Sequence, residues 1–195
     1  RLARYSTDGV TIITVGDEPA ARLWDAKTLK PHVMLRHGEA VRITGLIAIP
    51  GSPLIATVTD RGAVRLWNSQ DGEAVGRLVH GREVPLIATS PDGKMLVSVS
   101  EHMLRVWELP SGRQLASATP RPGGPPRSVQ FSTDGRFIVT AGPAATELWE
   151  ASSLQRLAEL PRAREAKFAP DGGHVLLNRS EFWNWRENRR LGAQF

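Results

Sequence analysis

The chain has 195 residues, of which 41% are hydrophobic and 23% charged, a composition typical of a folded domain and not of a disordered or collagen-like chain. The formal charge is +5, but 20 acidic residues are scattered among the 25 basic ones, unlike the concentrated basic arm of a nucleic-acid-binding protein. Cysteine is absent, which excludes disulfides, thiolate nucleophiles and cysteine-based zinc sites. We therefore expect a cytoplasmic globular protein.

The most apolar stretch of the chain is GLIAIPGSPLIATV, at residues 45–58. It is interrupted by Pro50, Gly51 and Pro53, and it is shorter than the roughly 18 residues that a membrane helix needs. We expect no membrane span and no membrane partner.

A short segment that contains tryptophan occurs five times along the chain. The copies are ARLWD (21–25), VRLWN (64–68), LRVWE (104–108), TELWE (146–150) and FWNWR (182–186). We align them on Trp24, Trp67, Trp107, Trp149 and Trp185. The spacing is about 40 residues, which is the period of a four-stranded propeller repeat.

A turn signal keeps the same phase as the tryptophans. Asp-Gly pairs end STDG (6–9), SPDG (90–93), STDG (132–135) and APDG (169–172), and PGSP (50–53) takes this place in the second unit. An aliphatic or β-branched run follows each of them, which predicts a β-hairpin because glycine accepts positive φ there. Four glycines therefore have an expected structural role, namely Gly9, Gly93, Gly135 and Gly172.

Each unit is expected to supply four short antiparallel strands, which cannot bury both faces of their sheet alone. Stacking of the sheets around an axis buries them, with the tryptophan as a wedge between neighbours. The predicted fold is all-β, a propeller of five tandem four-stranded blades in a single region. Their approximate ranges are 1–42, 43–84, 85–126, 127–164 and 165–195.

These motifs resemble the WD-repeat β-propeller family. ARLWD carries the Trp-Asp pair itself, and the SPDG form is also characteristic of the family. The resemblance implies a buried network of histidine, aspartate and a strand hydroxyl, in which His37 and His80 match the histidine. The aspartate position is occupied by Glu18, Arg61, Glu101 and Pro143. We therefore expect most of the network to be missing, and we interpret the two histidines as structural and not as metal ligands.

The number of blades leaves two architectures open. Propellers usually have about four to eight blades, and the resemblance implies about seven in the parent ring. Both ends of the chain are already used by strands, so none remains to complete another blade. We expect an open arc from a larger ring, with a closed five-blade ring as the alternative.

No convergent set of reactive residues is found in the sequence. HVMLRH places His32 and His37 on opposite faces of a strand, which is poor zinc geometry. PRPGGPPR, at residues 120–127, lacks the Gly-Lys-Ser/Thr ending of a phosphate loop and is interpreted as a long stiff loop. We expect no enzyme activity, no metal and no cofactor.

The resemblance implies a non-enzymatic scaffold that binds a protein or peptide through the loops that join the units and those that precede the tryptophan strands. Arginine pairs well with carboxylate or phosphate, which favours an acidic partner. The candidate binding residues are Arg36, Arg61, Arg82, His102, Arg121, Arg162, Arg164 and Arg179. The plain alternative is that these are solvated loop charges.

Three further expectations remain open at this point. A small-ligand or enzymatic propeller would use reactive residues in the central channel. A nucleic-acid-binding propeller would lose affinity steeply with salt. By analogy of fold, the chain is expected to be part of a bacterial signalling protein with another domain, such as a protein kinase.

Overall fold

The computed structural model describes residues 2–16, 18, 20–38, 41–80, 86–100 and 102–191. They form strands β1 to β20, in five separate four-stranded antiparallel sheets. The described residues contain no helix that is long and apolar enough to cross a membrane. The prediction of an all-β chain of five four-stranded blades is confirmed.

Every blade uses four strands in chain order, with the first strand at one edge of the sheet and the fourth at the other. Blade 1 contains β1 (Leu2–Tyr5), β2 (Thr11–Val15), β3 (Ala20–Asp25) and β4 (Pro31–Arg36). Blade 2 contains β5 (Ile43–Ala48), β6 (Leu54–Thr59), β7 (Ala63–Asn68) and β8 (Ala74–Val79). Blade 3 contains β9 (Leu86–Thr89), β10 (Met95–Val99), β11 (Leu104–Glu108) and β12 (Gln114–Ala118).

The last two blades repeat this order. Blade 4 contains β13 (Ser128–Phe131), β14 (Phe137–Ala141), β15 (Thr146–Glu150) and β16 (Arg156–Leu160). Blade 5 contains β17 (Ala166–Phe168), β18 (His174–Leu177), β19 (Glu181–Asn184) and β20 (Arg189–Arg190). The first strands β1, β5, β9, β13 and β17 contact one another in succession, so they are the inner strands.

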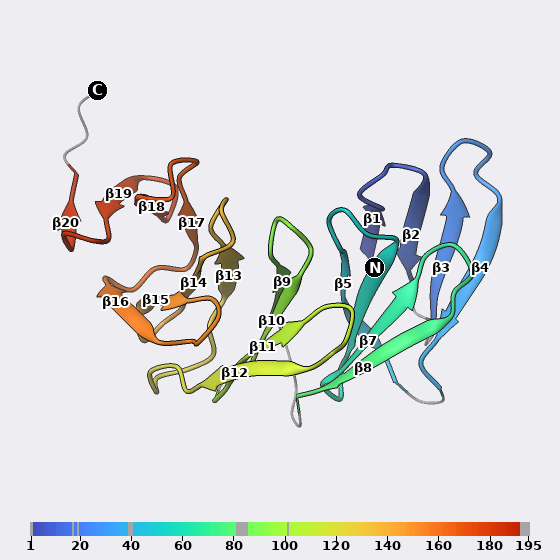
Figure 1. Cartoon of the computed structure of the whole chain (residues 1–195), viewed down its shortest axis with the longest axis horizontal. Helices are drawn as coiled ribbons and strands as arrows, with labels where there is room; N and C mark the ends of the chain where they lie inside the picture. The colour runs from blue at the N-terminus through green and yellow to red at the C-terminus, as the bar shows by residue number, and fades with distance from the viewer. Residues whose placement is uncertain are drawn as a thin grey trace.

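The five blades follow one another along an open arc, with blades 1 and 5 at its opposite ends (Figure 1). No sheet closes the arc into a ring among the described residues. This is the arrangement expected from the sequence, and the closed five-blade alternative is not formed.

A hydrophobic cluster fills each of the four junctions between neighbouring blades. The tryptophan of one blade packs against the preceding blade, and Trp67, Trp107 and Trp149 are at most 5% exposed. The register of the third and fourth strands slips by one residue beside each of these three indoles. Trp24 has no preceding blade in the described chain and is half-buried.

Strand pairing corrects the alignment of the fifth copy. The residue after the tryptophan pairs with the first residue of the second strand in blade 4, where Glu150 faces Phe137. In blade 5 the corresponding pair is Asn184 and His174, so Trp183 and not Trp185 occupies the repeated position. Trp183 and Trp185 are two residues apart and would share one side of an extended strand, which is why the sequence did not distinguish them. In the structure Trp183 lies in β19, whereas Trp185 begins the turn that follows it.

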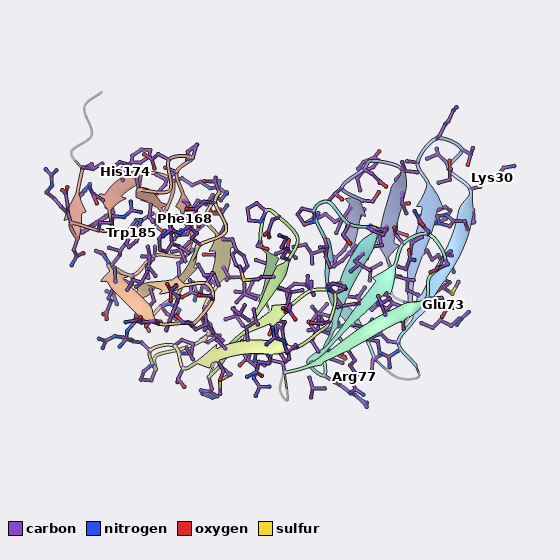
Figure 2. The ribbon with its side chains drawn as sticks, in the orientation of Figure 1. Lys30, Glu73, Arg77, Phe168, His174 and Trp185 are labelled. Atoms are coloured by element: carbon purple, nitrogen blue, oxygen red, sulfur yellow. The ribbon has the colours of Figure 1, made fainter. Side chains whose placement is uncertain are left out.

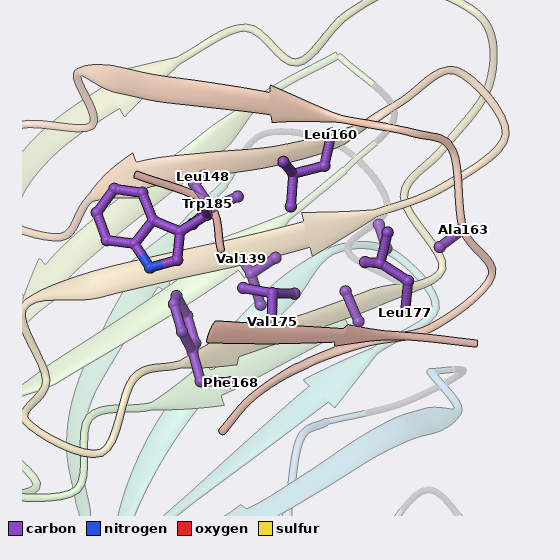
Figure 3. Packing of buried hydrophobic residues seen from close by; sticks show 10 residues of the cluster. Val139, Leu148, Leu160, Ala163, Phe168, Val175, Leu177 and Trp185 are labelled. Carbon is purple, nitrogen blue, oxygen red and sulfur yellow. The ribbon is translucent and has the colours of Figure 1, made fainter. Parts of the chain in front are cut away.

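Trp185 is nevertheless buried in the junction between blades 4 and 5. Its indole N–H donates to the Gly172 carbonyl at 3.0 Å, and its ring meets that of Phe137 edge-on, with centroids 5.0 Å apart. Figure 3 shows Trp185 and Phe168 at one end of this cluster and Ala163 and Leu177 at the other. The cluster therefore extends through the sandwich of the two blades, from one face of the arc to the other.

Candidate functional site

Antiparallel strand order divides the loops between two faces of the arc. The turns between first and second strands and between third and fourth strands lie on one face, which we call the turn face. The turns between second and third strands, and the loops that join blades, lie on the other face, which we call the arginine face. Figure 2 labels two residues that mark this direction on β8. Glu73 comes just before the strand, toward the turn face, and Arg77 lies farther along it, toward the arginine face.

The Asp-Gly turns belong to the turn face, and their carboxylates bind their own backbone. Asp92 accepts the Ser90 hydroxyl at 2.6 Å and the Lys94 amide at 3.0 Å. These hydrogen bonds hold the pKa of the Asp92 carboxyl below its usual range, and the bond from Ser90 has the largest effect. The same arrangement recurs at Asp8 and Asp134. These side chains stabilise the turns.

The candidate binding residues that the structure describes lie in the loops of the arginine face or at the strand ends beside them. Three of them, Arg162, Arg164 and Arg179, line a single pocket between blades 4 and 5. Arg36, Arg61 and His102 are exposed elsewhere on this face. Arg82 lies outside the described residues.

The guanidinium of Arg121 is occupied by an ion pair. It lies 2.5 Å from Glu159, while the Arg121 amide donates to the Glu147 carboxylate at 3.2 Å. Glu147 is 3% exposed and also pairs with Arg156 at 2.8 Å. Arg121 thus anchors the loop between blades 3 and 4. The signal in the sequence was TELW, where blades 1 to 3 have arginine instead of Glu147.

The pocket between blades 4 and 5 has a volume of about 690 Å³ and includes a fourth arginine, Arg127, which is not among the predicted binding residues. Arg127 ends the proline-rich loop and precedes β13. It satisfies the criterion used for the others, because it lies in a loop that joins two blades. A second arginine-lined pocket of about 300 Å³ contains Arg61, Arg65 and Arg77.

Glu165 is the acidic residue among those that line the larger pocket. Its carboxylate contacts the Lys167 ammonium at 2.8 Å and the Arg179 guanidinium at 3.0 Å. These two cations hold the pKa of the Glu165 carboxyl below its usual range, so it is ionised at neutral pH. Arg127, Arg162 and Arg164 form no ion pair with any described residue.

A family comparison agrees with this architecture. The family model "WD domain, G-beta repeat" matches residues 77–108, which include the end of β8 in blade 2 and the strands β9 to β11 of blade 3. Residues 77–108 thus match a repeat unit of the WD-repeat family, and the five sheets are consistent with WD-repeat propeller blades. Proteins of this family are typically scaffolds for protein interactions, and their WD-repeat domains are generally non-catalytic.

Curated relatives include WD-repeat proteins of very different lengths. Human apoptotic protease-activating factor 1 is 30% identical over 117 residues, which cover 55% of this chain and 9% of that protein. The LST8 homolog of Drosophila melanogaster is 25% identical over 166 residues, which cover 80% of this chain and 53% of the relative. Transcription initiation factor TFIID subunit 5 of Caenorhabditis elegans is 27% identical over 157 residues, which cover 78% of this chain and 24% of the relative.

The chain thus spans between about a tenth and about half of these relatives. They are eukaryotic proteins, and they give no support to the expectation of a bacterial signalling protein.

More of the WD-repeat hydrogen-bond network is present than the sequence indicated. The Thr57 hydroxyl lies 2.7 Å from the Trp67 indole nitrogen and 2.5 Å from His37 Nε2. Ser98 joins Trp107, at 2.8 Å, to His80 Nδ1, at 2.7 Å. The expectation that most of the network is missing is therefore wrong for these two blades. The hydroxyl connects indole and imidazole even though an aspartate is absent.

Burial shifts the titration of both histidines. The pKa of His37 is lowered to about 4, mainly by burial and to a smaller extent by the positive charge of Arg65. The pKa of His80 is likewise lowered to about 4, mainly by burial and to a smaller extent by the positive charge of Arg105. Both imidazoles are therefore neutral at neutral pH and lie inside the blade stack. Within the described chain, no group of three or more histidine, aspartate or glutamate side chains is placed to hold a metal ion.

Proposed function

We propose that the chain is a non-enzymatic scaffold that binds an acidic segment of a partner protein on its arginine face. The observation that carries the proposal is that the turn carboxylates have partners within the chain, whereas several arginines of the arginine face have none. The turn carboxylates of Asp8, Asp92 and Asp134 are bonded to their own turns. The guanidinium groups of Arg61, Arg162 and Arg164 are exposed and form no ion pair within the described chain.

Exposed arginine suits this role because its charge is permanent and its planar fork donates two parallel hydrogen bonds to a carboxylate. Such contacts also accelerate encounter with an oppositely charged partner. The proposal includes a cytoplasmic location, which the absence of cysteine favours.

The test uses a fluorescent glutamate- and aspartate-rich peptide, with anisotropy as the readout. The variant Arg61→Glu/Arg162→Glu is compared with the control Lys27→Glu/Arg136→Glu, which reverses two exposed charges on the turn face. We expect the first variant to weaken binding by about tenfold or more and the control to leave it within about twofold. Equal loss in both variants, or no loss in either, would contradict the proposal.

The same assay separates the alternative of nucleic-acid binding. A single-stranded oligonucleotide that binds more tightly than the acidic peptide, with affinity falling steeply as salt rises, would favour that alternative.

A further inference from the structure

The pocket between blades 4 and 5 concentrates positive charge in one place. Four of its lining residues are arginines, namely Arg127, Arg162, Arg164 and Arg179, and one is acidic, Glu165. Glu165 already pairs with Arg179 and with Lys167 outside the pocket lining. Three guanidinium groups are therefore left with no carboxylate partner among the described residues, and their mutual repulsion is not compensated by the chain.

The backbone that carries these arginines is tied together from both blades. The Arg127 amide donates to the Ala141 carbonyl at 2.7 Å, and the Arg164 amide donates to Asn178 Oδ1 at 2.9 Å. The neighbouring Ser128 hydroxyl accepts the Ala166 amide at 3.3 Å, which links the inner strands of the two blades. Ala163, which lines the pocket, is itself part of the buried cluster below it (Figure 3).

The turn at the rim of the pocket has an unusual backbone. Asn178 and Arg179 both adopt left-handed conformations, with φ of 51° and 65°. Asparagine tolerates this region, but arginine is disfavoured there, and glycine is the usual residue at the second position of such a hairpin turn. The Arg179 side chain is thus placed at the pocket despite a local conformational cost.

We propose that this pocket binds the phosphoryl group of a phosphorylated serine or threonine side chain in the partner. The inference rests on the proposed function and specifies its ligand. A phosphate monoester carries a charge of about −1.5 to −2 and three acceptor oxygens, whereas a carboxylate carries one charge and two oxygens. Three unpaired guanidinium forks supply more charge and more donors than one carboxylate can use, and they match the phosphoryl group.

The lining also distinguishes this ligand from the phosphates of a nucleic acid. Single-stranded nucleic acids bind to grooves that combine basic residues with aromatic side chains on which bases stack. No aromatic residue is among the described residues that line the pocket, and their arginines are confined to one blade junction. A side-chain phosphate on a peptide fits this geometry better than a continuous sugar-phosphate backbone.

The test compares three labelled peptides that are identical except for one central residue, which is phosphoserine, glutamate or serine. Binding is measured by anisotropy at about 0.15 M salt, where long-range attraction is largely screened. We expect the affinity for the phosphoserine peptide to exceed that for the glutamate peptide by about tenfold or more. We expect Arg162→Gln/Arg164→Gln to abolish this preference.

A matched variant controls for the general charge of the face. Arg61→Gln/Arg77→Gln removes two exposed arginines from the second pocket. It should lower the affinity for the phosphoserine and glutamate peptides to a similar extent and so retain the preference for phosphoserine. Both pairs are exposed, so thermal unfolding of the variants should match that of the parent chain.

Each outcome decides a different point. Equal affinity for the phosphoserine and glutamate peptides would overturn this inference while leaving the proposed function intact, whereas binding of neither would overturn both. Equal loss of the preference in the two double variants would contradict the assignment to this pocket. Displacement of the phosphoserine peptide by an equal concentration of inorganic phosphate would indicate a free-phosphate site instead. Tighter binding of an oligonucleotide would indicate a nucleic-acid site.

Discussion

On the turn face, the carboxylates of the Asp-Gly turns are hydrogen-bonded within their own turns, whereas on the arginine face Arg61, Arg162 and Arg164 meet no carboxylate in the described chain. The carboxylate of Asp92 has two donors within its own turn, and its lowered pKa reports how well it is satisfied. A guanidinium without a partner stabilises nothing in the chain but can bind another molecule. The Asp-Gly carboxylates that recur in several blades are therefore structural, while the arginines concentrated at one junction are candidates for binding.

The largest effect is expected on the turn face, at Gly93. This residue has φ of 68°, and a Cβ there would lie 2.1 Å from the Pro50 carbonyl oxygen of the neighbouring blade. Gly93→Ala should lower the free energy of unfolding by about 3 to 5 kcal/mol, through a disfavoured backbone and a steric overlap. Chemical denaturation measures this loss.

Gly172 provides the matched control, because it has φ of 65° but no atom within 4 Å of an added Cβ. Gly172→Ala should cost only about 1 to 2 kcal/mol, from the backbone alone. Equal losses at the two positions would show that contact between turns of neighbouring blades does not matter.

Acidification should destabilise the chain in two steps. His37 and His80 have pKa values of about 4 when folded, below the ordinary value of 6.5, so the unfolded chain binds more protons between these limits. Stability is therefore complete above about pH 6.5 and falls as the pH is lowered toward 4. Below that, Asp8, Asp92 and Asp134 lose the stabilisation that their lowered pKa values reflect.

Thermal unfolding across this pH range tests the expectation, with a His37→Asn/His80→Asn variant as the comparison. The variant should be less stable at neutral pH, because buried contacts are lost, but its stability should change less between pH 6.5 and 4. An unchanged pH dependence would exclude the histidines as its source.

A single turn carboxylate should have a moderate effect. Asp92→Ala removes the partner of the Ser90 hydroxyl and the Lys94 amide, which should cost about 1 to 2 kcal/mol in urea denaturation. Glu18→Ala removes an exposed ion pair with Arg22 and should cost less than about 1 kcal/mol. A larger cost at Glu18 than at Asp92 would reverse the assignment of structural charge.

The smallest effect on stability is expected on the arginine face. Arg162→Gln/Arg164→Gln removes two exposed guanidinium groups without ion pairs in the described chain, so the free energy of unfolding should change by less than about 0.5 kcal/mol. The same denaturation assay measures it. A loss comparable to that of Asp92→Ala would show that these arginines stabilise the blades.

Local sequence patterns were sufficient to predict the blades. Asp-Gly turns and aliphatic runs determine hairpins locally, and a sheet with two apolar faces must stack. The patterns failed where two solutions were locally equivalent, as at Trp183 and Trp185, because residues two apart would share one side of a strand. Only the pairing of β18 with β19 shows that the strand ends before Trp185.

The candidate site could be predicted only in part, because it depends on how two blades meet. Loop position identified Arg162, Arg164 and Arg179, but their convergence with Arg127 follows from the packing of blade 5 on blade 4. The ion pair that occupies Arg121 also joins segments far apart in the chain, because its partner is Glu159. Periodicity within one blade carries no information about such contacts.

Hydrogen exchange in the presence and absence of the phosphoserine peptide tests the division between the two faces most directly. We expect slower exchange at residues 161–165 and 178–180, which border the arginine-lined pocket, and unchanged exchange at residues 90–94 and 132–136 in the Asp-Gly turns. Slower exchange in the Asp-Gly turns, with no change around the pocket, would contradict the assignment of binding to the arginine face.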